Sequence, residues 1–175
     1  MATIIKSIGA TGRNYATISL WESGEDGDLV TLAEIHRGEM YADADFDENV
    51  IIDGSITSAA YYMHLTAASG QNHSGLAGGG VRLNLTGTSV SGSIVTISDP
   101  FTRIDNIELT QGVTSLSSEF FGVVAGAGGS DVVVHSMLIH DLIAPSGSNL
   151  AVRAITNNEK LDWKVYRNFI YDLQH

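Results

Sequence analysis

The last third of the chain carries one pattern of apolar and polar positions twice. The segment at 120–142 (FFGVVAGAGGSDVVVHSMLIHDL) is followed by a matching segment at 151–173 (AVRAITNNEKLDWKVYRNFIYDL). A step of 31 residues places Phe121 on Val152, Val134 on Val165, Ile139 on Ile170, Asp141 on Asp172 and Leu142 on Leu173. Short apolar strands that repeat at a fixed step predict stacked coils, in which neighbouring copies bury each other's apolar faces.

Shorter apolar runs predict the elements that precede this repeat. Strands are expected at 3–8, 50–53, 61–68, 81–86 and 93–98, one or two strands at 29–41, and a coil at 94–112. A short helix is expected after Asn14, which can cap it, because Tyr15, Ile18 and Trp21 then share one face. We interpret this helix as a lid over the first coil, with an ordinary surface helix as the alternative.

These elements predict an all-β protein, a right-handed parallel β-helix (solenoid) with a short N-terminal capping α-helix. Residues 1–28 would form the first strand and the capping helix, and residues 29–175 the coils. Only two residues follow Leu173, so no C-terminal cap is expected. Further chain or a partner subunit would then cover the last strands, since open strand edges invite pairing.

The facing of individual strands is only partly determined by the pattern. Arg153 is expected to point outward, which turns Val152 and Ala154 inward and leaves Ile155 outside with its counterpart Val124. Outward apolar residues indicate either a contact surface or scattered surface side chains. For the strand at 165–173, two alignments stay open: Ile104 with Val134 and Val165, or Asn106 with Asn168.

Composition and charge exclude several kinds of site and several classes of function. The chain has 19 Gly, two Pro and no Cys, which suits many tight turns and excludes disulfides and thiolate metal sites. The net charge is −11, and the first 53 residues hold 11 acidic and three basic side chains. This balance argues against a nucleic-acid surface. No apolar run reaches the roughly 18–20 residues of a membrane span, and the N-terminus lacks a secretory apolar core.

Three segments of the first half of the chain carry distinctive motifs. The opening at 4–23 has an Asn-Tyr-x-Thr-Ile and Trp-Glu pattern, formed by Asn14, Tyr15, Thr17, Ile18, Trp21 and Glu22. The other two are GEMYADADFDENVIIDG at 38–54 and the Gly-rich loop at 67–84, which leads into a strand. All three resemble segments of right-handed parallel β-helix proteins that occur mostly in bacteriophage and environmental viral sequences. The resemblance implies a β-helix in a virion or extracellular setting, trimeric by family analogy, and implies no particular reaction.

One acidic loop is a candidate cation site. Asp43-x-Asp45-x-Asp47 resembles the first half of a calcium loop, because Ca²⁺ takes six to eight hard oxygen ligands. The second half departs from that pattern, with Glu48 where Gly is usual and Gly54 where Glu is usual. The alternative is a solvated acidic turn that protects a sheet edge. No other cofactor is expected.

Paired carboxylates are the candidate catalytic groups. Glycan-cleaving β-helices place such pairs on an exposed strand face, and the candidates are Asp105 with Glu108, and Asp141 with Asp172 one coil apart. Close carboxylates raise each other's pKa, which suits acid–base work, but Asp at a strand-to-turn junction commonly has a structural role. His135 and His140 are five apart and would project to opposite faces of a strand, so they are not expected to share a metal.

Two function hypotheses follow. The first is a structural or receptor-facing virion component, such as a phage tail fibre, spike or baseplate-associated β-helix, that forms a homo-oligomer or contacts other virion subunits and can bind a surface glycan. The alternative is a polysaccharide-degrading enzyme, a lyase or glycosidase, on the same scaffold. Fold alone does not decide between them.

Overall fold

The computed structural model describes residues 1–87, 90–113, 116–144, 150–160 and 162–174. It is a parallel β-solenoid of about five turns, with 44% strand and 8% helix, which confirms the predicted parallel β-helix. The elements are β1 (Ala2–Ile8), α1 (Ile18–Glu25), α2 (Leu29–Leu32), β2 (Glu34–Met40), β3 (Val50–Ile52), β4 (Met63–Ala67), β5 (Arg82–Gly87), β6 (Val90–Ile97), β7 (Arg103–Asp105), β8 (Glu108–Val113), β9 (Leu116–Ala125), β10 (Val133–His135), β11 (Leu138–Ile139), β12 (Val152–Thr156), β13 (Lys164–Tyr166) and β14 (Phe169–Ile170).

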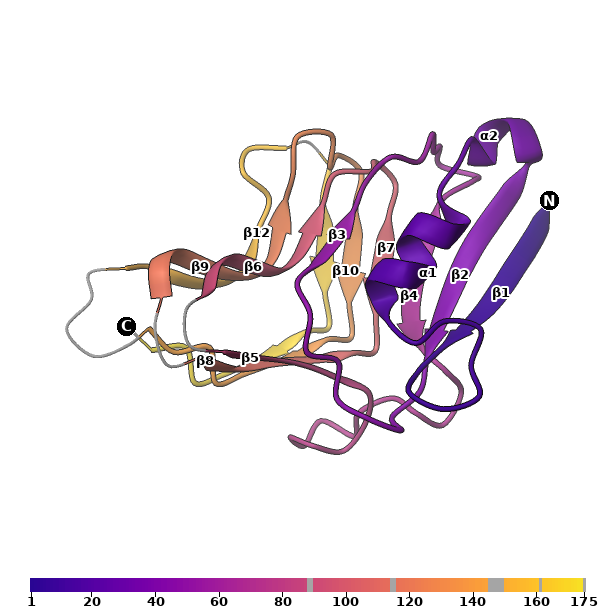
Figure 1. The fold of residues 1–175 in the computed structure, drawn as a ribbon. Helices are drawn as coiled ribbons and strands as arrows, with labels where there is room; N and C mark the ends of the chain where they lie inside the picture. The colour runs from indigo at the N-terminus through magenta and orange to yellow at the C-terminus, as the bar shows by residue number, and fades with distance from the viewer. Residues whose placement is uncertain (88–89, 114–115, 145–149, 161, 175) are drawn as a thin grey trace.

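Three parallel sheets form the sides of the solenoid (Figure 1). Sheet 1 has the order β1-β2-β4-β7-β10-β13, sheet 2 the order β5-β8-β11-β14, and sheet 3 the order β3-β6-β9-β12. Every strand pairs with the strand one coil away, so residues far apart in sequence lie side by side. Each coil therefore exists only because its neighbours satisfy its backbone hydrogen bonds.

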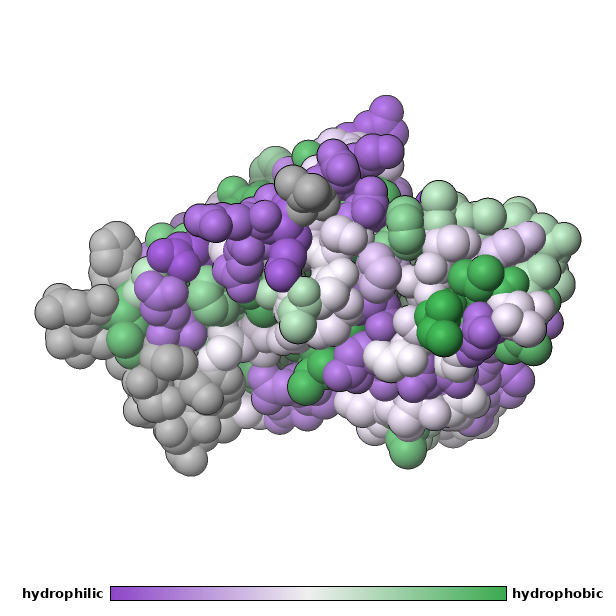
Figure 2. All heavy atoms as spheres, turned by 90° about the horizontal axis from the view of Figure 1, so that it is seen from above, coloured by the Kyte–Doolittle hydropathy of each residue, from purple (hydrophilic) through white to green (hydrophobic). Residues whose placement is uncertain are grey.

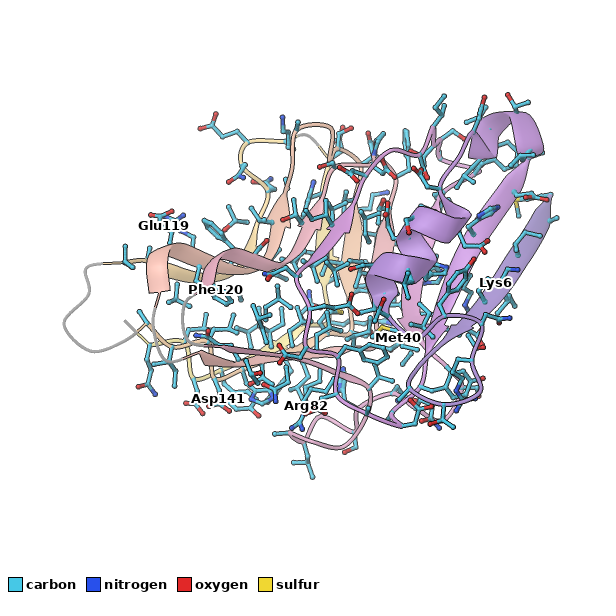
Figure 3. All side chains as sticks on the ribbon, viewed as in Figure 1. Lys6, Met40, Arg82, Glu119, Phe120 and Asp141 are labelled. Carbon is cyan, nitrogen blue, oxygen red and sulfur yellow. The ribbon has the colours of Figure 1, made fainter. Side chains whose placement is uncertain are left out.

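The register of sheet 1 shows which side chains of these strands point inward, which the sequence left open. Leu65, Ile104, Val134 and Val165 occupy one row along β4, β7, β10 and β13. The first three have no exposed surface, so this row points into the core. Met40 and Phe120 point into the same interior (Figure 3). The 31-residue step is confirmed for Val134 on Val165 and for Ile139 on Ile170.

Sheet 3 departs from the predicted alignment by one residue. Val152 pairs with Phe120 and Arg153 with Phe121, so the prediction that Phe121 falls on Val152 was wrong. Ile155 pairs with the fully buried Val123 and packs against the core, and Val124 is also buried. The expected outward pair of Ile155 and Val124 is therefore not an exposed contact surface, because the two segments are 32 residues apart here rather than 31.

The predicted lid helix is present, with a different cap. Helix α1 contacts β1, β2 and β3 and places Ile18 and Trp21, both without exposed surface, in the core. Gly38 of β2 lies under the indole, where an added Cβ would approach Trp21 to 2.7 Å. Thr17 is the N-cap, since its hydroxyl accepts from Leu20 N at 3.1 Å. Asn14, the predicted cap, instead accepts from Ser7 N at 2.9 Å.

The segment at 29–41, predicted as one or two strands, divides differently. Residues Leu29–Leu32 form the short helix α2, and only Glu34–Met40 is a strand. Asp28 caps α2 by accepting from Thr31 N at 2.9 Å, and Ala33 ends it in the left-handed conformation with φ 57°. Capping by local side-chain hydrogen bonds thus overrides the strand-like apolar spacing.

Corners between strands use residues with positive φ at matching places in successive coils. Asn106, Ser136 and Arg167 have φ values of 62°, 53° and 57°, and they separate sheet 1 from sheet 2. Asp141 and Asp172 repeat the same conformation after β11 and β14, with φ values of 52° and 50°. Asn and Asp tolerate this conformation better than other non-glycine residues, which is why several of them stand at these corners.

The outer surface is mixed in character. Figure 2 shows apolar atoms gathered at the N-terminal end of one face. The exposed apolar side chains of α1 and α2 are Leu20, Val30 and Leu32. In the last described coil the apolar side chains of β13 and β14 are exposed as well, among them Val165, Phe169 and Ile170. None of the helices in the described part of the chain is long and apolar enough to cross a membrane.

Candidate functional site: the outer face of sheet 1

The outer face of sheet 1 carries two rows of side chains, because alternate residues of each strand point away from the core. The first row is Arg37, His64, Arg103, Val133 and Lys164 on five successive strands. The second row is Glu39, Thr66, Asp105, His135 and Tyr166. Stacking thus brings cationic, acidic, imidazole and phenol groups from five coils onto one surface.

Asp105 is the centre of this surface. His64 Nε2 lies 2.7 Å and His135 Nε2 3.3 Å from its Oδ2, while Asn106 Nδ2 donates to Oδ1 at 2.6 Å. The Thr66 hydroxyl donates a further short hydrogen bond to Oδ1. The carboxylate is buried although it points outward, because side chains from β4 and β10 and from the corner after β7 cover it. A buried charge with this many donors is fully compensated.

The electrostatics of Asp105 favour its charged form. Burial acts to raise the pKa of this carboxyl, but the hydrogen bond and charge of His64, the Thr66 hydroxyl and the charge of His135 together lower it below its ordinary value. Asp105 is therefore ionised at neutral pH. It can orient His64 through Nε2, while His64 Nδ1 has no protein partner among the described residues.

Aromatic rings flank this centre. The ring of Tyr166 stacks on His135 at 4.9 Å between centroids with 6° between the planes, and Tyr166 is 44% exposed. On the other side, the guanidinium of Arg103 lies 3.9 Å above the ring of Tyr62. A small cavity of about 150 Å³ adjoins them, lined in part by Arg103, Lys164 and two acidic residues. Tyr62 is buried beneath Arg103, so Tyr166 is the exposed ring of the two, and an exposed ring beside hydrogen-bonding groups is a surface that a sugar can stack on.

Glu108 does not join Asp105 at this site. It is fully buried on the outer side of sheet 2, where Gly78 N donates to its two oxygens at 3.0 and 2.8 Å and His140 Nε2 lies 3.0 Å from Oε1. Arg82 Nη1 is 3.9 Å away. The predicted Asp105–Glu108 pair is thus divided between two clusters on two sheets, one with His64 and His135 and the other with His140.

Asp141 and Asp172 stack one coil apart, at the corner after β11 and β14. Asp141 Oδ2 lies 2.7 Å from His140 Nδ1, so it belongs to the Glu108 cluster. Tyr171 stacks on His140 at 5.1 Å, and its pKa is raised first by burial and then by the charges of Asp141, Glu108 and Asp172. Figure 3 shows Asp141 on the same side of the molecule as Arg82, along sheet 2.

The three aspartates of the predicted calcium loop are held apart by different partners. Asp43 accepts from Ala10 N at 2.9 Å and Arg13 Nε at 3.1 Å. Asp45 pairs with Arg82, and Asp47 accepts from Thr86 N at 2.8 Å. The three carboxylates do not converge on one point in the described structure. Guanidinium groups already neutralise Asp43 and Asp45.

Three other acidic side chains do come together, at the end of α1. Carboxylate oxygens of Glu22, Asp26 and Asp99 lie within 4.8 Å of one another. Burial is the main cause that raises the pKa of Glu22 to about 7 and that of Asp99 to about 6, with contributions from the charges of Asp26 and Asp53. The Asp53 and Ser55 amides donate to this group at 3.1 Å. Glu22 and Asp99 are buried and Asp26 is exposed, and the two backbone hydrogen bonds give the cluster a structural role between α1 and the turns that follow β3 and β6.

Sequence reasoning missed the histidines as carboxylate partners. His64 and Asp105 are 41 residues apart, and His140 and Glu108 are 32 apart. The step from β4 to β7 is 39 residues rather than 31, so the repeat did not indicate that His64 and Arg103 share a row. His135 and His140 lie on different sheets rather than on one strand.

Comparison of the chain with protein-family models, with curated proteins and with solved structures found no match. The fold and the site are therefore the basis for the functional argument.

Proposed function

We propose that this chain is a structural or receptor-facing component of a virion, of the tail-fibre, spike or baseplate-associated kind, that binds a surface glycan. Three features support the proposal. The fold is a parallel β-solenoid, the N-terminal segments resemble viral β-helix proteins, and one outer face carries aromatic and hydrogen-bonding side chains in register. A virion or extracellular location follows from the same proposal.

The proposed glycan binding rests on the arrangement of side chains on the outer face of sheet 1. Tyr166 offers an exposed ring, and Arg103 and Lys164 offer donors in the adjacent row. Sugars are recognised by ring stacking combined with hydrogen bonds from side chains that are already held in place. Here the stacking of Tyr166 on His135, and of Arg103 on Tyr62, holds them.

A panel of immobilised bacterial surface polysaccharides tests this proposal. The wild-type chain is expected to bind at least one member, and Arg103→Ala should weaken that binding by about tenfold, the loss expected for one charge-assisted hydrogen bond. Arg153→Ala is the matched control, since Arg153 also lies over an aromatic ring, Phe121, but on sheet 3. Binding to no polysaccharide, or equal losses in both variants, would contradict the proposal.

The virion role also predicts self-association, for which we propose a trimer. Light scattering measures the mass in solution directly, against 18.6 kDa for one chain. A mass near three chains supports the proposal, and a strict monomer at all concentrations counts against it.

A polysaccharide-degrading enzyme is the second candidate, and the pair of His64 and Asp105 favours it. Asp105 orients His64, whose Nδ1 is left to act as a general base beside Arg103. On a uronate polymer, His64 would take the proton next to the carboxylate that Arg103 neutralises. The C–H electrons would form the new C=C bond as the C–O bond to the glycosidic oxygen breaks, and that oxygen would keep the bond's electrons and take a proton from solvent.

Ultraviolet absorbance of the unsaturated product would detect this reaction. His64→Asn should abolish activity while it preserves the shape of the ring site, and Asp141→Asn, in the other cluster, is the comparison. Activity that survives His64→Asn would exclude this residue as the base. Loss in Asp141→Asn alone would move the assignment to sheet 2.

A further inference from the structure

A polar cleft lies away from the outer face of sheet 1. It has a volume of about 400 Å³ and is formed by the loop at 42–45, the Gly-rich loop at 70–80 and Arg82 at the start of β5. Figure 1 shows the two loops near each other beside sheet 2, and Figure 3 shows Arg82 in this region. A volume of this size falls within the range of small-molecule sites.

Both walls of the cleft are fixed before any ligand arrives. The Gly-rich loop is closed at its neck by Val81 N, which donates to Gln71 O at 2.8 Å, and is anchored at Gly78 by the buried Glu108. Between these two points of the loop, His73 Nε2 lies 2.7 Å from Ser136 O. A wall that is held at three points loses little conformational entropy on binding.

The opposite wall is held as firmly. Phe46 N donates to Arg82 O at 3.0 Å, so the acidic loop is paired to the start of β5. Asp43 is fixed by Ala10 N, and Ala42 N donates to Gln71 Oε1 at 3.0 Å, which ties the two walls together. This loop is therefore part of the framework of the cleft rather than a free acidic turn.

The chemistry of the lining selects a class of ligand. The pKa of Asp45 is lowered, first by the hydrogen bond from Arg82, and the pKa of Asp43 is lowered by the Ala10 amide and Arg13 against the effect of burial. Both are ionised acceptors with lone pairs to spare. Gln71 Nε2 has no protein acceptor in the described part of the chain, so it is a donor left for a ligand.

We propose that this cleft binds an uncharged sugar through its hydroxyl groups. Hydroxyls donate to the carboxylates of Asp43 and Asp45 and accept from Gln71 and Arg82, so rows of ring hydroxyls satisfy both kinds of group. A cation is disfavoured because guanidinium groups already pair with both carboxylates. An anionic sugar is disfavoured by these carboxylates and by the excess of acidic residues over 1–53. This inference deepens the proposed glycan binding with a second site and a ligand class.

Saturation-transfer NMR with the methyl glycosides of glucose, galactose and mannose tests the assignment. At least one should bind the wild-type chain, and Asp45→Asn should weaken it by about tenfold. Asp47→Asn, an acidic residue of the same loop that bonds Thr86 outside the cleft, should not change it. Methyl glucuronide should bind at least about tenfold more weakly than its uncharged counterpart.

Gln71→Ala provides a second variant, since Asp45→Asn also removes the partner of Arg82. It should weaken binding while the circular dichroism spectrum stays that of wild type. Binding of none of the three glycosides, full binding by Gln71→Ala, or a preference for the glucuronide would overturn the inference. Arg103→Ala should leave glycoside binding intact. The cleft and the face of sheet 1 are therefore tested separately, and either assignment can fail alone.

Discussion

Replacing Glu108 by alanine removes the anchor between the Gly-rich loop and sheet 2. The fully buried carboxylate accepts from Gly78 N, and its Oε1 lies 3.0 Å from Nε2 of His140, which is buried as well. Each buried donor left without a partner costs about 1–3 kcal/mol. We therefore expect Glu108→Ala to lower the free energy of unfolding by about 1–3 kcal/mol, through the buried His140 donor that loses its partner.

Urea unfolding followed by tryptophan fluorescence and circular dichroism measures this loss. Glu119→Ala is the matched control, because Glu119 pairs with Arg153 at 3.0 Å with both side chains about half exposed. An exposed pair contributes about 0–1 kcal/mol. Hydrogen exchange of the Gly78 amide gives a local readout, and it should accelerate in Glu108→Ala. Equal stability losses in the two variants, or unchanged protection of Gly78, would refute the reasoning.

Two further predictions concern the N-terminal lid. Glu22→Gln should stabilise the fold above pH 7, because the folded state then no longer holds a buried charge next to Asp26, Asp53 and Asp99. In the wild type the raised pKa means that stability increases as pH falls from about 7 towards 4.5. The pH-dependent contribution of Glu22 to the free energy of unfolding is up to about 3 kcal/mol. Urea unfolding at several pH values measures it. A Glu22→Gln variant with the same pH profile as wild type would contradict the prediction. Thr17→Ala should cost about 1 kcal/mol through loss of the helix cap, with Thr17→Ser restoring it in thermal unfolding. No loss on this change would show that the cap is dispensable.

The sequence was most informative where the repeat is regular. Val134 on Val165 and Ile139 on Ile170 follow directly from the 31-residue step, and the buried side of α1 follows from Ile18 and Trp21. These predictions succeed because periodic apolar positions report on burial.

The remaining positions depend on lengths and local bonds that the repeat does not contain. One additional residue between β9 and β12 moves Phe121 off Val152. Local hydrogen bonds decide that Thr17 rather than Asn14 caps α1.

The candidate site was less accessible to prediction for a related reason. Asp105 and Glu108 were identified as carboxylates of interest, but their assignment to separate clusters requires the corner at Asn106, where φ is 62°. His64 reaches Asp105 only because of a 39-residue step between β4 and β7. Long-range register of this kind follows from loop lengths and corner conformations in three dimensions, which a pattern of apolar residues does not specify.

Distances along one row of sheet 1 test the central claim, that coils stack in parallel register, most directly. Ile5, Arg37, His64, Arg103, Val133 and Lys164 form that row, and the chain has no native cysteine to interfere with spin labelling. Double electron–electron resonance between labels at positions 5 and 133, and at 5 and 164, spans four and five strand spacings. We expect about 19 and 24 Å from a spacing of about 4.8 Å, with the second pair longer by one spacing. Equal distances, or a shorter distance for the second pair, would contradict the stacked architecture.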